Sequence, residues 1–189
     1  ESANHGVQIY GGHGFIAEWG MEQNVRDSRI SCLYEGTTGI QALDLMGRKV
    51  MQQQSAGLQV FLGMIDAFCT QHADDASLAE FIGPLREKAA EWHALTMQVG
   101  QRAVANADEV GAAAYDYLFY WGYVALAYWW ARSVAAADAS SRSAEFKTAK
   151  RETARFYFAR VLPRTNTHAQ AMAAGAETLM AMPDSAFDS

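Results

Sequence analysis

Glu35 is the residue whose type and position most directly suggest chemistry. It lies in a turn between Tyr34 and the Gly36-Thr37-Thr38 stretch, just before a segment with helical spacing of apolar residues. A carboxylate at such a junction can project into a cleft, where desolvation raises the pKa of a carboxyl group and lets it accept a proton. The same position suits a carboxylate that only stabilises the positive end of a helix. Local context alone favours this structural role.

A glycine-rich segment forms a second candidate site, with Gln8 followed by Gly11, Gly12 and Gly14. Glycines let the backbone approach a phosphate closely, and successive backbone N–H groups can bind an anion. The segment does not follow a strand, so it does not meet the dinucleotide-binding fingerprint. A tight turn between two helices explains the glycines equally well.

Other polar residues give weaker signals. The two cysteines, Cys32 and Cys69, are too few for a disulfide scaffold or a zinc site and are typical of a reducing compartment. No metal site is expected, because the histidines lack the spacing of metal ligands. These are His5, His13, His72, His93 and His168. A basic series between residues 147 and 164 is interrupted by Glu152, which favours a solvated face or an acidic neighbour.

The composition predicts a folded globular chain. Of its 189 residues, 50% are hydrophobic, 19% are charged and only 3 are proline, which excludes a disordered or collagen-like protein. The net charge of −6 argues against a nucleic-acid partner. Residues 110–131 could be mistaken for a membrane span, but their tyrosines and tryptophans are spread throughout, which predicts a helix buried by neighbours.

The spacing of apolar residues indicates an all-α protein of antiparallel helices joined by short connections. A glycine pair should end the first helix, and Thr37 or Thr38 should cap the helix through residues 40–50. Leu162-Pro163 should break the helix before it. The expected helices include Val7 and Gln8, then residues 21–30, 40–50, 58–72, 78–103, 110–138, 146–156 and 164–182.

Three segments in order give the sequence a specific likeness. They are QIYGGHGF at residues 8–15, VRDSRI at 25–30 and LYEGTTGIQ at 33–41. Together they resemble the C-terminal end of the flavin-dependent acyl-CoA dehydrogenases. The continuation through residues 40–49 resembles the long subfamily that contains 3-methylmercaptopropionyl-CoA dehydrogenase, whose members carry an additional helical domain.

This resemblance implies two domains. Residues 1–50 would be the end of the family's C-terminal four-helix domain, with the catalytic segment. Residues 51–189 would be the additional C-terminal helical domain.

The resemblance also assigns a reaction to the turn. Glu35 would be the base that removes the α-proton of an acyl-CoA thioester, while the β-hydrogen leaves as a hydride to FAD, giving the trans-2-enoyl-CoA. Hydrogen-bond donors must stabilise the charge that develops on the thioester oxygen, and in this family the backbone N–H of the base is one of them. Gly36 would lie against the thioester, where a side chain would obstruct it.

Cofactor contacts follow from the same resemblance. Thr37 would contact FAD, while Gln8, Gly11 and Gly12 would reach the adenosine and pyrophosphate part of an FAD bound mainly by a neighbouring subunit. That arrangement implies a homo-oligomer, either a dimer or a tetramer. Many relatives have Gln or Glu where this chain has Gly39, so one cofactor contact from a side chain is missing.

The resemblance further implies an enzyme of fatty acid metabolism with acyl-CoA as substrate and an electron-transfer flavoprotein as acceptor. The two scattered cysteines favour a cytoplasmic location, and the composition of residues 110–131 argues against stable membrane insertion. The sequence opens without a methionine and in mid-helix, which suggests a piece of a longer protein. We therefore expect the chain alone neither to retain FAD nor to turn over substrate. The main alternative is a non-catalytic helical module for interaction or oligomerisation. A membrane-associated subunit is a third possibility, based only on residues 110–131.

Overall fold

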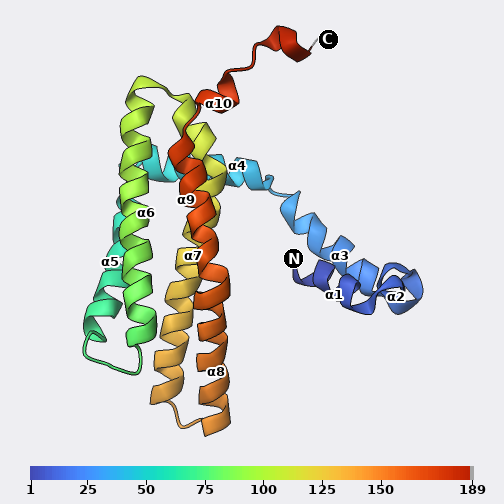
Figure 1. Ribbon diagram of the computed structural model, residues 1–189, viewed down its shortest axis with the longest axis vertical. Coiled ribbons are helices and arrows are strands. Elements are labelled where there is room, and N and C mark those ends of the chain that lie inside the picture. Colours follow the sequence, from blue (N-terminus) through green and yellow to red (C-terminus); the bar gives the residue numbers. More distant parts are fainter. Residues whose placement is uncertain (188–189) are drawn as a thin grey trace. The chain divides into compact units, whose positions relative to one another are not determined.

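The computed structural model describes residues 1–187, and every regular element in them is helical (Figure 1). The chain forms two compact units, residues 1–41 and the residues from Ala42 onward. The helix α4 (Thr38–Leu43) contains the boundary between them and continues into a π-helical segment, Asp44–Gln52. The expectation of an all-α chain is confirmed.

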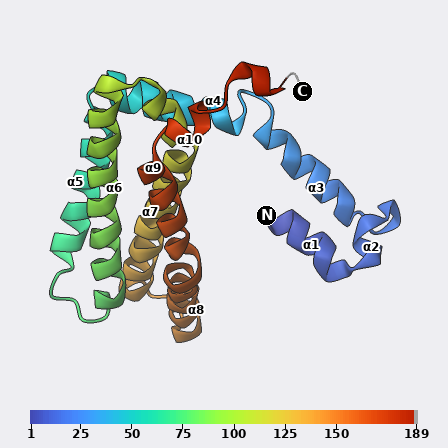
Figure 2. The same ribbon diagram turned by 45° about the horizontal axis from the view of Figure 1, so that its top comes forward.

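The first unit is a small helical assembly without an apolar core. Its elements are α1 (Ser2–Tyr10), α2 (Gly12–Phe15), a 3₁₀ turn (Ala17–Trp19), α3 (Met21–Arg29) and a second 3₁₀ turn (Ile30–Cys32). Helix α1 lies beside α3 (Figures 1 and 2). Among residues 1–41, all of which the structure describes, Gly14 alone is buried. A Cβ on Gly14 would lie 2.4 Å from the carbonyl oxygen of Val7, so only glycine fits there.

The second unit is an antiparallel bundle, in which successive long helices reverse direction (Figure 1). Short connections join its helices, as the sequence predicts. They are α5 (Ala56–Gln71), α6 (Ala79–Ala105), α7 (Asp108–Ala139), α8 (Ala144–Phe156), α9 (Thr165–Ala174) and α10 (Glu177–Met180), followed by a 3₁₀ turn (Asp184–Phe187).

Helix α7 forms the centre of the bundle and packs against α6, α8, α9 and the π-helical segment. Tyr117, Tyr120 and Val124 on this helix are fully buried, as is Trp92 on α6. The alanines of α7 let neighbouring helices approach closely, so the helix is apolar on several sides because it is surrounded by protein. This confirms the prediction of a buried helix. Within residues 1–187 we find no helix that is both long enough and apolar enough to cross a membrane.

The break expected at Leu162-Pro163 is milder than predicted. A π-helical segment (Tyr157–Val161) and a 3₁₀ turn (Leu162–Arg164) follow α8 directly and lead into α9. Pro163 lacks an N–H donor, and it sits in the first positions of the 3₁₀ turn, where that donor is not needed. The chain therefore changes its hydrogen-bond pattern without leaving the helical path (Figure 1).

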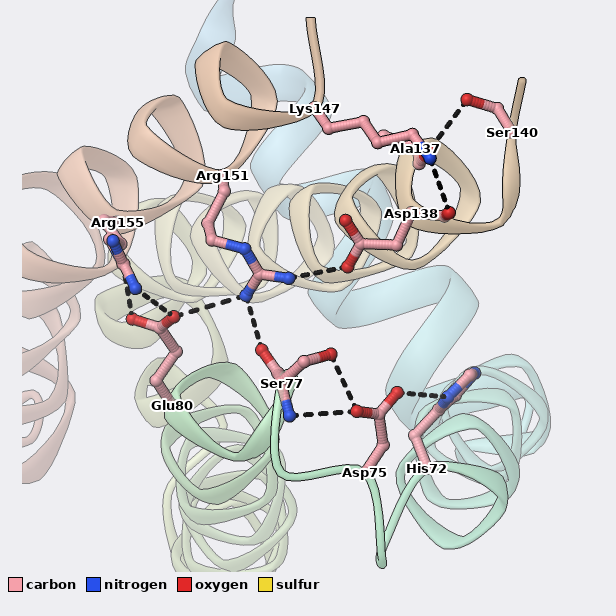
Figure 3. Close-up of polar contacts among 10 residues, drawn as sticks. All are labelled: His72, Asp75, Ser77, Glu80, Ala137, Asp138, Ser140, Lys147, Arg151 and Arg155. Atoms are coloured by element: carbon pink, nitrogen blue, oxygen red, sulfur yellow. Dashed lines mark hydrogen bonds and ion pairs between the residues drawn. The ribbon is translucent and has the colours of Figure 1, made fainter. Parts of the chain in front are cut away.

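A cluster of polar residues links the helices at one end of the bundle (Figure 3). We call it the polar clasp, and it consists of Ser77, Glu80, Asp138, Arg151 and Arg155. Arg155 donates two bonds to the Glu80 carboxylate, at 2.8 and 2.9 Å, and this interaction lowers the pKa of Glu80. Arg151 donates to Asp138 at 2.6 Å and to the carbonyl oxygen of Ser77. The clasp thus ties α8 to both α6 and the end of α7. These two arginines have the acidic neighbours that the interrupted basic series suggests.

Candidate functional site

Glu35 occupies a strained turn between α3 and α4. Its φ is +58°, in the left-handed region that costs a residue with a Cβ roughly 1–2 kcal/mol. Gly36 follows with a φ of +99°, so two consecutive residues have positive φ. Strained backbone of this kind persists only where surrounding contacts hold it, and it clusters at functional sites. The Glu35 side chain is exposed in this chain, so residues 1–187 do not supply the desolvation that a catalytic carboxylate needs.

The first turn of α4 holds this strained turn in place. The side-chain amide of Gln41 donates to the backbone carbonyl oxygen of Glu35 at 2.7 Å. A Cβ on Gly36 would lie 3.0 Å from Nε2 of Gln41 and 3.3 Å from Cγ2 of Ile40. The φ of residue 36 favours glycine, and a Cβ there would also force the Gln41 amide or Ile40 to shift by a few tenths of an ångström. This is a reason independent of the expected contact with a thioester.

Thr37 caps the helix that follows. Its hydroxyl oxygen lies 3.5 Å from the backbone nitrogen of Ile40, and its carbonyl oxygen accepts from the backbone N–H of Gln41 at 3.0 Å. The cap predicted from the sequence is present at Thr37. A hydroxyl has one donor and two acceptor positions, so capping leaves the Thr37 O–H free to donate to a cofactor.

The second set of predicted residues gathers where α1 ends and α2 begins. Gln8 and the backbone of Gly11 and Gly12 are all exposed. Gly11 has a φ of +60° and ψ of −140°, and its N–H donates to the Gln8 carbonyl oxygen at 3.1 Å. A Cβ added at Gly11 or Gly12 would meet nothing within 4 Å. Among residues 1–41, no side chain covers the backbone at Gly11 and Gly12, so a ligand bound elsewhere can approach it.

The structure does not bring the two sets of residues together. The junction of α1 and α2 lies at the N-terminal end of α3, whereas Glu35, Gly36 and Thr37 follow its C-terminal end (Figure 2). The nine residues of α3 span about 13 Å. The predicted cofactor-binding residues therefore form two separate contact points rather than one pocket.

Gln41 is the residue near the turn whose role the motif alone did not reveal. It belongs to the LYEGTTGIQ segment, but its place in that motif does not by itself indicate that its side chain reaches back six residues. The combination of a Glu-Gly turn, a threonine cap and a glutamine in the first turn of the next helix is the signal that could have suggested it. The bond becomes visible only once the positive φ of Glu35 is known.

Between residues 42 and 187, the second unit provides no comparable constellation. An apolar groove of about 450 Å³ lies among the π-helical segment, α5, α6 and α7. Among the described residues that line it, Lys49 carries a charge, and none is a predicted site residue. Across the described residues, no three His, Cys, Asp or Glu side chains are grouped so that they could hold a metal ion.

Two protein-family models together match almost the whole chain. Residues 1–51 match the model described as acyl-CoA dehydrogenase, C-terminal domain. Residues 61–183 match the model described as acetyl-CoA dehydrogenase C-terminal like. The first match includes every predicted site residue, and the second covers most of the bundle.

Curated relatives point the same way. The 3-methylmercaptopropionyl-CoA dehydrogenase of Ruegeria pomeroyi is 36% identical over 166 residues, which are 86% of this chain and 28% of the relative. The broad-specificity linear acyl-CoA dehydrogenase FadE5 of Mycobacterium tuberculosis is 29% identical over 196 residues, covering 96% of this chain and 32% of the relative. A butyryl-CoA dehydrogenase of Syntrophomonas wolfei is 34% identical over 80 residues, 42% of this chain and 13% of the relative.

The chain thus spans less than a third of the length of these relatives. Both matched models are C-terminal domains, and the strained Glu-Gly turn lies inside the first of them. The agreement between motif, helical fold and relatives means that this chain belongs to the acyl-CoA dehydrogenase family.

Proposed function

We propose that this chain supplies the catalytic base, Glu35, of an enzyme that oxidises an acyl-CoA thioester to the trans-2-enoyl-CoA. The observation that carries the proposal is the strained turn, in which Glu35 and Gly36 both have positive φ and are held by α4. Glu35 carries both a carboxylate and a backbone N–H, and its left-handed φ fixes how these two groups are placed relative to each other. Membership of the acyl-CoA dehydrogenase family supports an acyl-CoA thioester as the substrate on which these two groups act.

In the proposed reaction the Glu35 carboxylate accepts the α-proton of the thioester. The β-hydrogen leaves as a hydride, and accepting that hydride is the chemistry that FAD supplies when bound. The electron pair of the broken α C–H bond becomes the new α,β double bond. The backbone N–H of Glu35 stabilises the negative charge that develops on the thioester oxygen, because a fixed donor needs no reorganisation during the step. Gly36 keeps the approach of the thioester open.

The candidate residues fit FAD in two ways. Thr37 retains a hydroxyl donor beside the catalytic turn. Gln8, Gly11 and Gly12 offer an exposed amide and a bare backbone that a pyrophosphate can approach. We assign this second set to the FAD of a neighbouring subunit.

A larger assembly is further supported by the surface of residues 1–41. This unit exposes many apolar side chains, and large exposed apolar patches usually mark a surface that another protein segment covers. They are Ile9, Tyr10, Phe15, Ile16, Trp19, Ile30, Leu33, Tyr34 and Ile40. We propose that other parts of the enzyme, including a second subunit, cover them and exclude water from the exposed Glu35.

We propose that residues 1–50 form the end of the catalytic helical domain and residues 51–189 an additional domain. An electron-transfer flavoprotein is the proposed acceptor. One relative, 44% identical over 41 residues, is named as subunit CarC of the caffeyl-CoA reductase-Etf complex of Acetobacterium woodii. The proposed location is the cytoplasm, and the two free thiols, Cys32 and Cys69, suit a reducing compartment.

The test of the proposed base is Glu35→Gln in the enzyme that contains this chain. The variant should retain FAD but reduce it with acyl-CoA at least 10²-fold more slowly, because an amide cannot accept the proton. Glu18→Gln, a change at another exposed glutamate of the same unit, is the matched control and should leave the rate unchanged. Bleaching of the flavin at a normal rate in Glu35→Gln would reject the proposal.

The isolated 189-residue chain should be colourless and inactive, because only two small contact points for FAD lie within it. Its absorption spectrum after purification, with added FAD removed by gel filtration, measures this. A flavin spectrum at stoichiometric occupancy would contradict the expectation.

A further inference from the structure

Gln41 makes a contact that the helical fold does not require. Its side chain is exposed, so no buried polar group depends on the bond from Nε2 to the Glu35 carbonyl oxygen. At 2.7 Å this is a short bond for an amide donor and a carbonyl acceptor. The backbone N–H of Gln41 donates to the Thr37 carbonyl oxygen at 3.0 Å, which fixes the residue on the first turn of α4. A well-anchored side chain thus reaches back to one particular carbonyl group.

The position of that carbonyl group depends on the backbone conformation of Glu35. A glutamate is disfavoured at a φ of +58°, and relaxation to negative φ would swing the peptide that follows it. The swing would carry the carbonyl oxygen away from Nε2 of Gln41. The hydrogen bond therefore opposes the relaxation and stabilises the left-handed conformation.

The conformation of Glu35 controls two groups at once. The carboxylate and the backbone N–H belong to the same residue, so a rotation about φ moves one group relative to the other. In the proposed reaction one group removes the α-proton and the other stabilises the thioester oxygen. A small change in the relative position of the carboxylate and the N–H is enough to lower the rate substantially. Proton removal requires the carboxylate to be closely aligned with the α C–H bond.

We propose that Gln41 is a positioning residue that holds Glu35 in its left-handed conformation and so sets the geometry of base and oxyanion donor together. The proposal rests on the proposed function of Glu35. It also accounts for the close approach of the two residues, since Nε2 of Gln41 lies 3.0 Å from where a Cβ on Gly36 would be.

The test uses two variants of the enzyme that contains this chain. Gln41→Ala removes the amide, and Gln41→Glu keeps the length of the side chain but replaces its donor with acceptor oxygens. Flavin reduction at saturating acyl-CoA, expressed per bound FAD, should slow about tenfold in both, which is the effect of one net hydrogen bond. KM should stay within about twofold, because Gln41 is not proposed to touch the substrate. Gln23→Ala is the control, since Gln23 also donates from an exposed side chain, to Asp27 at 2.7 Å.

Each outcome has a clear meaning. A tenfold fall in kcat with unchanged FAD content and KM, in both variants and not in Gln23→Ala, supports the proposal. A normal rate in Gln41→Glu overturns it, even if Gln41→Ala folds poorly. An equal fall in Gln23→Ala also overturns it, because the effect would then be general. If Glu35→Gln is inactive while both Gln41 variants are normal, the base stands and only the positioning role fails. If Glu35→Gln is fully active, both fail.

Discussion

Replacing Glu109 with alanine is expected to lower the free energy of unfolding of the helical bundle by about 3 kcal/mol. The Glu109 carboxylate is almost fully buried, with 11% of the side chain exposed, and lies 2.9 Å from Nε of Arg102. It also accepts the backbone N–H of Ala176 at 3.1 Å. Arg102 in turn donates to the carbonyl oxygens of Ala173 and Met172, at 3.1 and 2.6 Å, at the end of α9. One ion pair therefore fastens the α6–α7 corner to the end of α9.

The magnitude follows from what alanine would leave behind. The Arg102 guanidinium would lose its counterion, and the buried N–H of Ala176 would lose its acceptor. Breaking a buried ion pair from one side costs about 3–5 kcal/mol. We expect the lower end of that range, because Arg102 is 28% exposed and keeps its two carbonyl partners. For a chain of this size the loss corresponds to a fall in Tm of about 6–12 °C.

Urea unfolding followed by tryptophan fluorescence and circular dichroism measures this change. Glu109→Ala should lower the midpoint with little change in m, and Glu109→Gln should lie between it and the unmodified chain, because its amide oxygen can still accept from Ala176. Glu87→Ala is the matched control, since Glu87 is 75% exposed and should change stability by no more than about 0.5 kcal/mol. A Glu109→Ala midpoint equal to that of Glu87→Ala would refute the argument.

Two further predictions concern the turn and the polar clasp. Gly36→Ala, which introduces a Cβ at a φ of +99° and 3.0 Å from Nε2 of Gln41, should slow flavin reduction by acyl-CoA at least about tenfold in stopped-flow measurements. A rate within twofold of the unmodified enzyme would contradict this. The bonds from Arg155 hold the pKa of Glu80 below its ordinary value, so their stabilisation is present above about pH 5 and is lost as the pH falls below the ordinary carboxyl range. Glu80→Gln should therefore weaken the fall in unfolding midpoint between about pH 5 and pH 3, and an unchanged pH profile would argue against it.

The helices were predictable because burial imposes its spacing on the sequence. Leu85, Trp92 and Val99 recur along α6 at intervals of seven, and all three are buried. The burial of α7 by neighbouring helices was predictable from the spread of its aromatic residues. A helix that packs against protein on several sides needs large apolar side chains on those sides. The cap at Thr37 followed from the preference of hydroxyl side chains for the free N–H groups of a helix start.

Features that depend on distant partners were not predictable. The π-helical segments at Asp44–Gln52 and Tyr157–Val161 depend on how one turn of helix meets its neighbours, which apolar spacing does not encode. No motif or spacing in the sequence connects Glu109 and Arg102 with each other or with residues 172–176, and only the fold brings them to the end of α9.

The candidate site was predictable only as a motif. The segment around Glu35 identified the family, but the positive φ of Glu35 and the bond from Gln41 belong to three-dimensional structure. Propensity does not predict a glutamate with left-handed backbone, because its cost must be met by contacts from elsewhere. The exposure of Glu35 in this chain is equally invisible in the sequence.

The role of Glu35 as the base can be measured separately from hydride transfer. An acyl-CoA thioester with α-hydrogens but no hydrogen on its β-carbon cannot be oxidised, yet its α-hydrogens can still exchange. Incubated in D₂O with the FAD-containing enzyme that includes this chain, such a thioester should gain deuterium at the α-carbon, as mass spectrometry would detect. We expect exchange with the unmodified enzyme and with Glu18→Gln, and at least 10²-fold slower exchange with Glu35→Gln. Exchange at the unmodified rate in Glu35→Gln would contradict this expectation.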